Sequence, residues 1–426
     1  MSKKSPFTLV LFVALVFALV FTTYGGAGAQ EGQTFVISVD NTGHFPYSSS
    51  GAFNTPAGSS GAGPALPGDA YRFSFNAAPG ENVSFATMFV QSNDWFFAPD
   101  ENGIPVYNAD GSPNTGDVTA YVGLWDAGTE GDQQLGSGSD QAPRQAAPDS
   151  GPQDPNRQVR RVLSSELPEM AELIQVTLSQ TGPNRFSLNL QNVSGSSALP
   201  TPFAPGAYVV HNNQAPLFVN GQADRGLGLE AIAEDGNPAA LAGNLAAKSG
   251  INTPLAPVAW LVHRSPGDLF SAAHAASAGL ETLAEDGGPG ALVAEQGDAN
   301  AGAAAVGRSA SGPGPIFAPD GNYQFTVTAE PGDHLSLASM FVQSNDSFFG
   351  LDSLPLFDAD GNPRSGDVTG YVTLFDAGTE VDEAPGYGAN QAPRQAGPNT
   401  GASQGGVISP TSQAVGGNIH VTITPQ

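Results

Sequence analysis

An apolar residue followed by two closely spaced acids is the first pattern in this sequence that could do chemistry. Asp126 comes directly after Trp125, Gly128 lets the chain turn sharply, and Glu130 can then return beside Asp126. Two carboxylates held together repel each other and raise one pKa unless a cation lies between them. Hard cations such as Ca²⁺ take about six to eight oxygen ligands. The segment therefore predicts a calcium site, and a strand–turn with solvated acids is the alternative.

A third acid, Asp94, follows another predicted strand at residues 83–90, and the loops of a β-sandwich cluster at its ends. The pattern occurs twice: SNDWFF and LWDAGTE in the first copy become SNDSFF and LFDAGTE in the second. The absence of cysteine and of a histidine partner argues against zinc or copper, so Ca²⁺ is the expected cofactor. The predicted metal ligands are Asp94, Asp126 and Glu130 in one site and Asp346, Asp376 and Glu380 in the other.

The elements that must position these acids are also repeated. SFATMFVQSND at 84–94 matches SLASMFVQSND at 336–346, and QAPRQA occurs at 141–146 and 391–396. Short alternating strands separated by turns, with 54 Gly and 35 Pro, are typical of an all-β protein. The expected fold is therefore two tandem antiparallel β-sandwich domains.

The border between the two domains is predicted from their final strands. Predicted strands at 174–179 and 419–424 end the two copies, and an alternating strand at 185–191 would open the second. The domains are therefore expected at 30–182 and 183–426.

The second predicted domain has an additional front half that contains a smaller repeat. TPFAPGAYVVH at 201–211 resembles TPLAPVAWLVH at 253–263, and each is followed by a GLExxAEDG segment. Short helices are expected at 227–234 and 238–248, because Asn237 and Pro238 suit a helix start. On this interpretation the first domain has a shortened front half.

The N-terminus predicts export. Lys3 and Lys4 precede an apolar run at residues 7–21, and Ala-Gly-Ala at 27–29 provides a cleavage site, so residues 1–29 are expected to be a signal peptide. An uncleaved N-terminal anchor is the alternative. The remaining sequence predicts no transmembrane span, and export without cysteine favours a bacterial protein.

The net charge limits the partners. It is −26, or −28 without the two signal-peptide lysines, and such a surface repels nucleic acid. We therefore expect no nucleic-acid partner and an extracellular or cell-surface ligand whose identity the sequence does not give.

The motifs SNDWFF, LWDAGTE, QAPRQA, TPFAPGAYVVH and GLEAIAEDG together resemble the spondin N-terminal domain family. The resemblance covers 184–426 and about 63–150. It implies a C2-like β-sandwich with bound calcium, whose ligands would be the six acids named above. Two departures stand out: Glu130 and Glu380 replace an aspartate of the family pattern, and Ser347 replaces its aromatic residue.

The predicted function is that of a secreted, non-enzymatic calcium-binding adhesion or binding module, in which calcium fixes loops at one end of each sandwich. A structural protein of an envelope or surface layer is one alternative. A carbohydrate-active hydrolase that uses the paired carboxylates is the other, since such enzymes need two acids about 5–9.5 Å apart.

Overall fold

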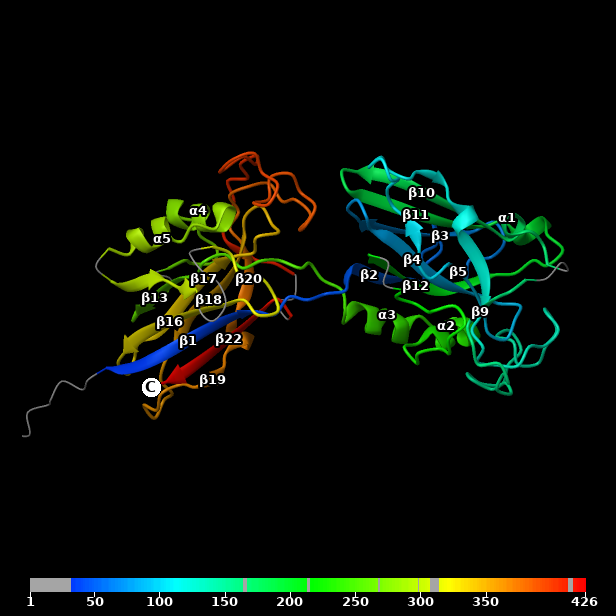
Figure 1. Ribbon diagram of the computed structural model, residues 1–426, viewed down its shortest axis with the longest axis horizontal. Helices are drawn as coiled ribbons and strands as arrows, with labels where there is room; N and C mark the ends of the chain where they lie inside the picture. Colours follow the sequence, from blue (N-terminus) through cyan, green and yellow to red (C-terminus); the bar gives the residue numbers. More distant parts are fainter. Residues whose placement is uncertain are drawn as a thin grey trace, which may run out of the picture.

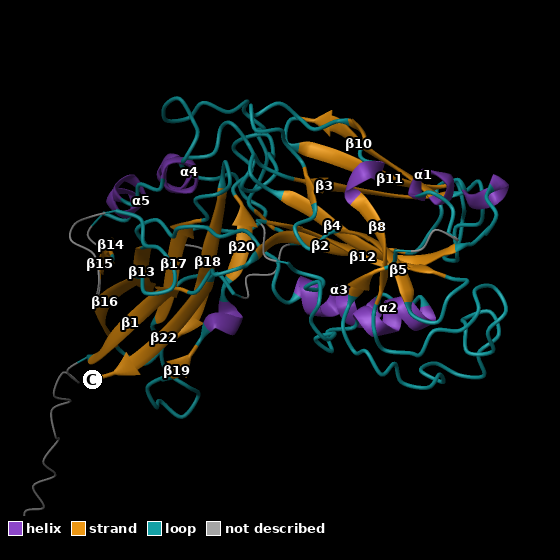
Figure 2. Ribbon diagram, turned by 45° about the vertical axis from the view of Figure 1, so that its right-hand side comes forward, coloured by secondary structure: helices purple, strands orange, loops and turns teal. Residues whose placement is uncertain are grey.

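The structure is a computed structural model that describes residues 32–163, 167–212, 215–266, 269–297, 299–306, 314–412 and 417–426. Antiparallel sheets dominate the two lobes and the helices are short, which confirms the expected all-β sandwich fold (Figures 1 and 2). The signal peptide predicted over 1–29 lies outside the described residues. Within these ranges no helix is long and apolar enough to cross a membrane.

Sandwich A is built from residues 47–249 and pairs a larger sheet with a smaller one. The larger sheet contains, in spatial order, β2 (Tyr47–Phe53), β12 (Phe203–His211), β4 (Asn82–Phe89), β5 (Trp95–Pro99), β8 (Val122–Asp126) and β9 (Arg160–Arg161), with β6 (Ile104–Pro105) beside β4. The smaller sheet contains β3 (Ala70–Asn76), β11 (Arg185–Asn192), β10 (Ile174–Gly182) and β7 (Gly116–Asp117). The helices are α1 (Met170–Leu173), α2 (Leu229–Asp235) and α3 (Ala239–Ala246).

Sandwich B is built from residues 33–41 and 250–426 and repeats this plan. Its larger sheet contains β14 (Asn300–Ala303), β13 (Ala259–His263), β17 (His334–Met340), β18 (Ser347–Pro355), β20 (Thr373–Asp376) and β21 (Ser409–Pro410). Its other sheet contains β15 (Ala305–Val306), β16 (Asn322–Ala329), β1 (Gln33–Asn41), β22 (Ile419–Pro425) and β19 (Gly366–Asp367). The helices are α4 (Ala278–Asp286) and α5 (Gly290–Glu295).

The predicted border after residue 182 is wrong. β10 and β11 form a hairpin of one sheet, with Val176 opposite Leu190 and Leu178 opposite Leu188. β11 continues the sheet by pairing with β3. Because β10 and β11 bury side chains in the same core, the chain cannot divide between them.

The front half assigned to the second domain is divided between the sandwiches. β12, α2 and α3 complete sandwich A, whereas β13, α4 and α5 complete sandwich B. The smaller sequence repeat is therefore one front half for each sandwich, and sandwich A is not shortened. In sandwich A the front half follows the other strands in the chain, whereas in sandwich B it precedes β16 to β22. The order of the two halves is therefore permuted between the sandwiches.

The N-terminal strand β1 belongs to sandwich B, although sandwich A follows it in the chain. It pairs with β16 and β22, as β11 pairs with β3 and β10 in sandwich A. The two strands end on equivalent buried asparagines: the Asn41 amide donates to the Thr253 carbonyl at 2.8 Å, and the Asn192 amide donates to the Thr201 carbonyl at 2.8 Å. β1 and β11 are therefore exchanged between the two sequence copies.

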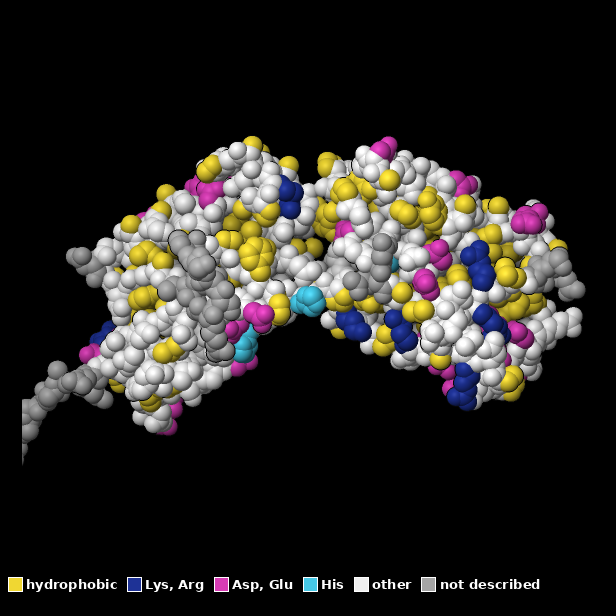
Figure 3. All heavy atoms as spheres, viewed as in Figure 1, with side chains coloured by type: hydrophobic (Ala, Val, Ile, Leu, Met, Phe, Trp, Pro, Cys, Tyr) yellow, Lys and Arg dark blue, Asp and Glu magenta, His cyan; other side chains and the backbone are white. Residues whose placement is uncertain are grey.

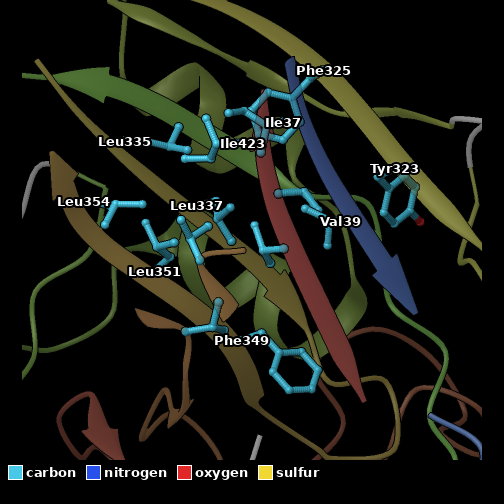
Figure 4. Packing of buried hydrophobic residues seen from close by; sticks show 14 of the residues in the cluster. Ile37, Val39, Tyr323, Phe325, Leu335, Leu337, Phe349, Leu351, Leu354 and Ile423 are labelled. Carbon is cyan, nitrogen blue, oxygen red and sulfur yellow. The ribbon is translucent and has the colours of Figure 1, made fainter. Parts of the chain in front are cut away.

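Each sandwich has a core between its sheets. In sandwich B the close view shows Ile37 and Val39 from β1 beside Ile423 from β22, facing Leu337 and Leu351 from the other sheet (Figure 4). Full burial of one such aliphatic side chain contributes about 1.5–3 kcal/mol. The strand supplied by the N-terminus is thus a central part of this core.

A second apolar layer lies on the outer face of each larger sheet. In sandwich A, Phe96 and Trp125 pack with Ile232 and Leu241 of the two helices. β4 is consequently buried on both faces, and every one of its residues is buried. The helices therefore pack on the same sheet that carries the acidic motifs.

Two linkers cross between the lobes and lie side by side. The Asn252 side chain accepts a hydrogen bond from Phe45 N at 2.7 Å and donates one to Phe45 O at 2.9 Å. Elsewhere the Asn184 amide of sandwich A donates to the Tyr387 carbonyl of sandwich B at 2.9 Å. Figure 3 shows a notch between the lobes on the face in view.

Candidate metal centre

The DAGTE turn begins at the last residue of a strand in each larger sheet, β8 in sandwich A and β20 in sandwich B. Asp126 is the final residue of β8, and its Oδ1 accepts a hydrogen bond from Gly128 N at 2.7 Å. Gly128 has φ +70°, and a Cβ there would lie 2.7 Å from the Gln158 carbonyl oxygen, so only glycine fits. Asp376 and Gly378 make the same turn in sandwich B, with a bond of 2.6 Å.

The aspartate of the SND segment fixes this turn. Asp94 Oδ2 accepts hydrogen bonds from Thr129 N at 2.8 Å and Glu130 N at 3.1 Å, and Asp346 Oδ2 does the same for Thr379 N and Glu380 N. Both aspartates are completely buried, yet their Oδ1 atoms have no hydrogen-bond partner. One oxygen of each carboxylate is thus structural, and the other is available to a ligand.

The structure brings together two of the three predicted ligands in each site. Carboxylate oxygens of Asp94, Asp126 and Asp132 lie within 4.8 Å of one another, and Asp346, Asp376 and Asp382 form the equivalent group. We call these groups outer triad A and outer triad B.

Asp132 and Asp382 were missed in the sequence. They lie two residues beyond the predicted glutamates in both copies, in GTEGD and GTEVD, and this shared position is the signal that could have found them.

Glu130 and Glu380 point elsewhere. Glu130 Oε1 accepts a hydrogen bond from Gly151 N at 2.6 Å, and Glu380 Oε1 accepts one from Gly401 N at 2.6 Å. A Cβ on either glycine would overlap the glutamate carboxylate, so glycine permits this close approach. The glutamates tie the long loops after the turn to the sandwich, and their role as metal ligands stays a prediction.

Burial dominates the electrostatics of the outer triads. Burial raises the pKa of Asp94 to about 6, and burial together with the Asp94 charge raises the pKa of Asp126 to about 7. In outer triad B, burial raises the pKa of Asp346 to about 6, and Asp376 adds to the effect. Without a cation, the ionised form of these aspartates is therefore disfavoured in both triads.

Arg160 supplies a cation to outer triad A. It lies opposite Asp126 in the β8–β9 ladder, and its guanidinium contacts the Asp126 carboxylate. The same Nη2 lies 2.7 Å from Asp154 Oδ2 and 3.6 Å from Asp132 Oδ2. Trp95 also donates its indole N–H to Asp132 at 2.9 Å.

Outer triad B lacks both supports. Ser409 is opposite Asp376 in the β20–β21 ladder, where Arg160 is opposite Asp126. Ser347 begins β18 in the place of Trp95. Among the described residues, no Lys or Arg forms an ion pair with Asp346, Asp376 or Asp382.

A second acidic group in sandwich A lies between the turn and α2. Carboxylate oxygens of Glu130, Asp149 and Glu234 lie within 4.8 Å of one another. Burial raises the pKa of Glu234 to about 8 and that of its counterpart Glu285 on α4 to about 7. The repeated AEDG segment is the sequence signal for these two glutamates.

No protein-family model and no curated protein matches the chain. The resemblance to the spondin N-terminal domain family therefore stays a prediction that rests on the repeated motifs.

Proposed function

We propose that the protein is an exported, non-enzymatic calcium-binding module in which outer triad B binds the ion. The bound ion would fix the DAGTE turn and the loops around it at one end of sandwich B. An extracellular or cell-surface ligand would then bind at this ordered end.

The observation that carries the proposal is the comparison of the two triads. Outer triad A contains the guanidinium of Arg160 among its carboxylates, whereas outer triad B has the same acids with Ser409 in that position. A buried carboxylate without a compensating partner is costly. A bound cation would offset that cost for Asp346, whose Oδ1 is buried and without a partner.

The ligand chemistry favours calcium over softer metals. All the side-chain donors in outer triad B are carboxylate oxygens, and hard oxygen donors suit Ca²⁺ or Mg²⁺. Ca²⁺ accommodates irregular geometry, whereas Mg²⁺ demands a near-ideal octahedron. Asp382 is exposed, so the ion would have a solvent-facing side on which water or an anionic group of a partner could complete its coordination.

Export is supported by the sequence of the N-terminus, where two lysines precede an apolar run and a small-residue cleavage site. A charge of −26 also suits a protein that works in the presence of abundant divalent cations, because free cations screen its self-repulsion.

Thermal unfolding of the full chain tests the proposal. At about 10 mM Ca²⁺, above the range of about 10⁻⁴–10⁻³ M typical of extracellular modules, the unfolding midpoint of sandwich B should exceed that in EDTA. A hundredfold excess over Kd corresponds to a shift of about 5–10 °C.

Asp376→Asn keeps the side-chain shape but removes one ligand charge, so it should abolish the shift. Asp360→Asn is the control, since Asp360 lies in an exposed turn. Identical unfolding of the wild type in calcium and in EDTA, or an undiminished shift in Asp376→Asn, would contradict the proposal.

A further inference from the structure

Glu234 is a buried acid that the outer triads do not use. It lies on α2, its residue surface is 1% exposed, and neither carboxylate oxygen has a hydrogen-bond partner. Its side chain points at Glu130 and Asp149, because one oxygen of each acid lies within 4.8 Å of the others. We call this group the inner triad.

The charge of the inner triad is not compensated by the protein. Arg160 is engaged by Asp126 and Asp154, and no Lys or Arg in the described ranges forms an ion pair with Glu130 or Glu234. Glu130 does accept hydrogen bonds from Gly151 N at 2.6 Å and from the Asn93 amide at 3.3 Å. Neither oxygen of Glu234 has a hydrogen bond of normal geometry, although the Thr129 side chain lies near this carboxylate, and such a poorly satisfied state is costly for a buried acid.

The same arrangement is built a second time in sandwich B. Glu285 on α4 is 2% exposed, and both of its oxygens lack partners, as does Oε2 of Glu380. Asn399 replaces Asp149 at the same loop position, and both residues have φ +50°. Glu234 and Glu285 are thus equivalent buried glutamates in the two sandwiches, which argues that the arrangement has a common cause. The group in sandwich B has one carboxylate fewer, because it contains Asn399.

We propose that Glu130, Asp149 and Glu234 bind a second divalent cation of the calcium class, separate from the outer triads. The cation would join three segments: the C-terminal turn of α2, the DAGTE turn and the loop around Asp149. All side-chain donors are carboxylate oxygens, which excludes a soft metal. The equivalent position in sandwich B, with Asn399, has one negative charge fewer and binds the ion more weakly.

Counting bound calcium in the full chain tests the inner triad independently of outer triad B. Metal-free protein is dialysed against Ca²⁺ at pH 7.5, and bound ions per chain are measured together with a calorimetric titration. Glu234→Gln preserves the shape of the side chain and should lower the count by one. Asp376→Asn should lower it by one at a different site, and the double variant by two.

Two further variants sharpen the result. Asp149→Asn imitates sandwich B and should weaken the inner site about tenfold while outer triad B keeps its affinity. Glu172→Gln, at an exposed position on α1, is the control for removal of one charge and should change neither the count nor the affinities.

The outcomes separate the two proposals. An unchanged count in Glu234→Gln, with a lower count in Asp376→Asn, overturns the inner site and leaves the proposed function standing. A lower count in Glu234→Gln alone supports the inner site and overturns outer triad B. If Asp149→Asn and Glu172→Gln alter binding equally, the effect is one of general charge and the inner site is overturned.

Discussion

Arg160 is paired in register with Asp126, and its guanidinium contacts the buried carboxylate at the end of β8. The equivalent pair in the other sandwich is Ser409 and Asp376. Two acidic triads with nearly the same local sequence therefore differ by one internal positive charge. This difference makes the triads unequal, and it gives a direct way to exchange their properties.

Arg160→Ser should convert outer triad A into a calcium-dependent site. Without calcium, loss of the guanidinium leaves Asp126 buried without its partner, and the free energy of unfolding of sandwich A should fall by about 3 kcal/mol. Calcium should restore most of the loss. The measurement is thermal unfolding with EDTA and with calcium.

Arg157→Ser is the matched control, because Arg157 is exposed and lies outside the triad. If Arg160→Ser lowers the stability of sandwich A but calcium does not restore it, outer triad A does not bind calcium, and the prediction is wrong.

The reciprocal change, Ser409→Arg, should make outer triad B independent of calcium. A guanidinium opposite Asp376 would compete with the ion for the same carboxylates. The expected result is a higher unfolding midpoint in EDTA and a calcium affinity at least about tenfold lower, measured by calorimetry. Unchanged affinity would mean that calcium binds elsewhere.

Calcium-free protein should lose stability as the pH rises from about 4 to about 8. Burial raises the pKa of Asp94 and Asp346 to about 6, of Asp126 to about 7 and of Glu234 to about 8, all above their unfolded values. The folded state therefore binds more protons than the unfolded state in this window, and its stability is greatest below it and declines through it.

His211 acts in the opposite direction. Burial lowers its pKa to about 4, so its contribution is present above about pH 6.5 and is lost as the pH falls toward 4. Because four carboxylates outweigh one histidine, the metal-free protein should still lose stability as the pH rises above about 4, with a shallower slope between pH 4 and 6.5, and calcium should flatten the decline. Unfolding midpoints at a series of pH values, with and without calcium, measure both slopes; a midpoint in EDTA that rises between pH 6 and pH 8 would contradict the prediction.

Chain fragments should fold according to the sandwiches and not according to the sequence repeats. Residues 44–250 contain every strand and helix of sandwich A and should unfold cooperatively on their own. Residues 183–426 lack β1, whose buried Phe35, Ile37 and Val39 contribute on the order of 5–9 kcal/mol. That loss is comparable with the whole stability of a domain, so this fragment should not fold.

Sandwich B should fold alone if its two pieces are joined. Residues 32–43 connected through a short Gly-Ser linker to 251–426 would restore β1, and the hydrogen bonds between Phe45 and Asn252 show that the two ends lie close together. Circular dichroism and amide dispersion in NMR spectra measure folding. Cooperative unfolding of 183–426 would contradict the exchange of β1 and β11.

Gly151→Ala should loosen the loop that Glu130 holds. The new methyl group would overlap the Glu130 carboxylate, so the 2.6 Å hydrogen bond from Gly151 N would break or the loop would shift, at a cost of about 1–3 kcal/mol. Gly61→Ala is the control, because open space surrounds a Cβ there. Equal proteolysis of the loop in the two variants would show that Gly151 does not need to be glycine.

The sequence by itself determined the all-β class, the number of sandwiches and the positions of the acidic turns. Alternation and turn residues are local properties, and two copies of the DAGTE segment with a glycine at the same place indicate two turns of the same geometry. Asp94 and Asp126 could be paired because their strands end at the same edge of a larger sheet.

Only the tertiary structure decided which strand completes which sandwich and which acids meet. Strands β1 and β11 have the same alternating pattern, so either could pair with either core, and the pairing depends on contacts far apart in the chain. Likewise Glu130 can rotate toward Asp94 or toward Gly151, and the choice follows from a loop that approaches through Gly151. Sequence spacing fixes where a side chain starts, whereas the packed loops fix where its charged end lies.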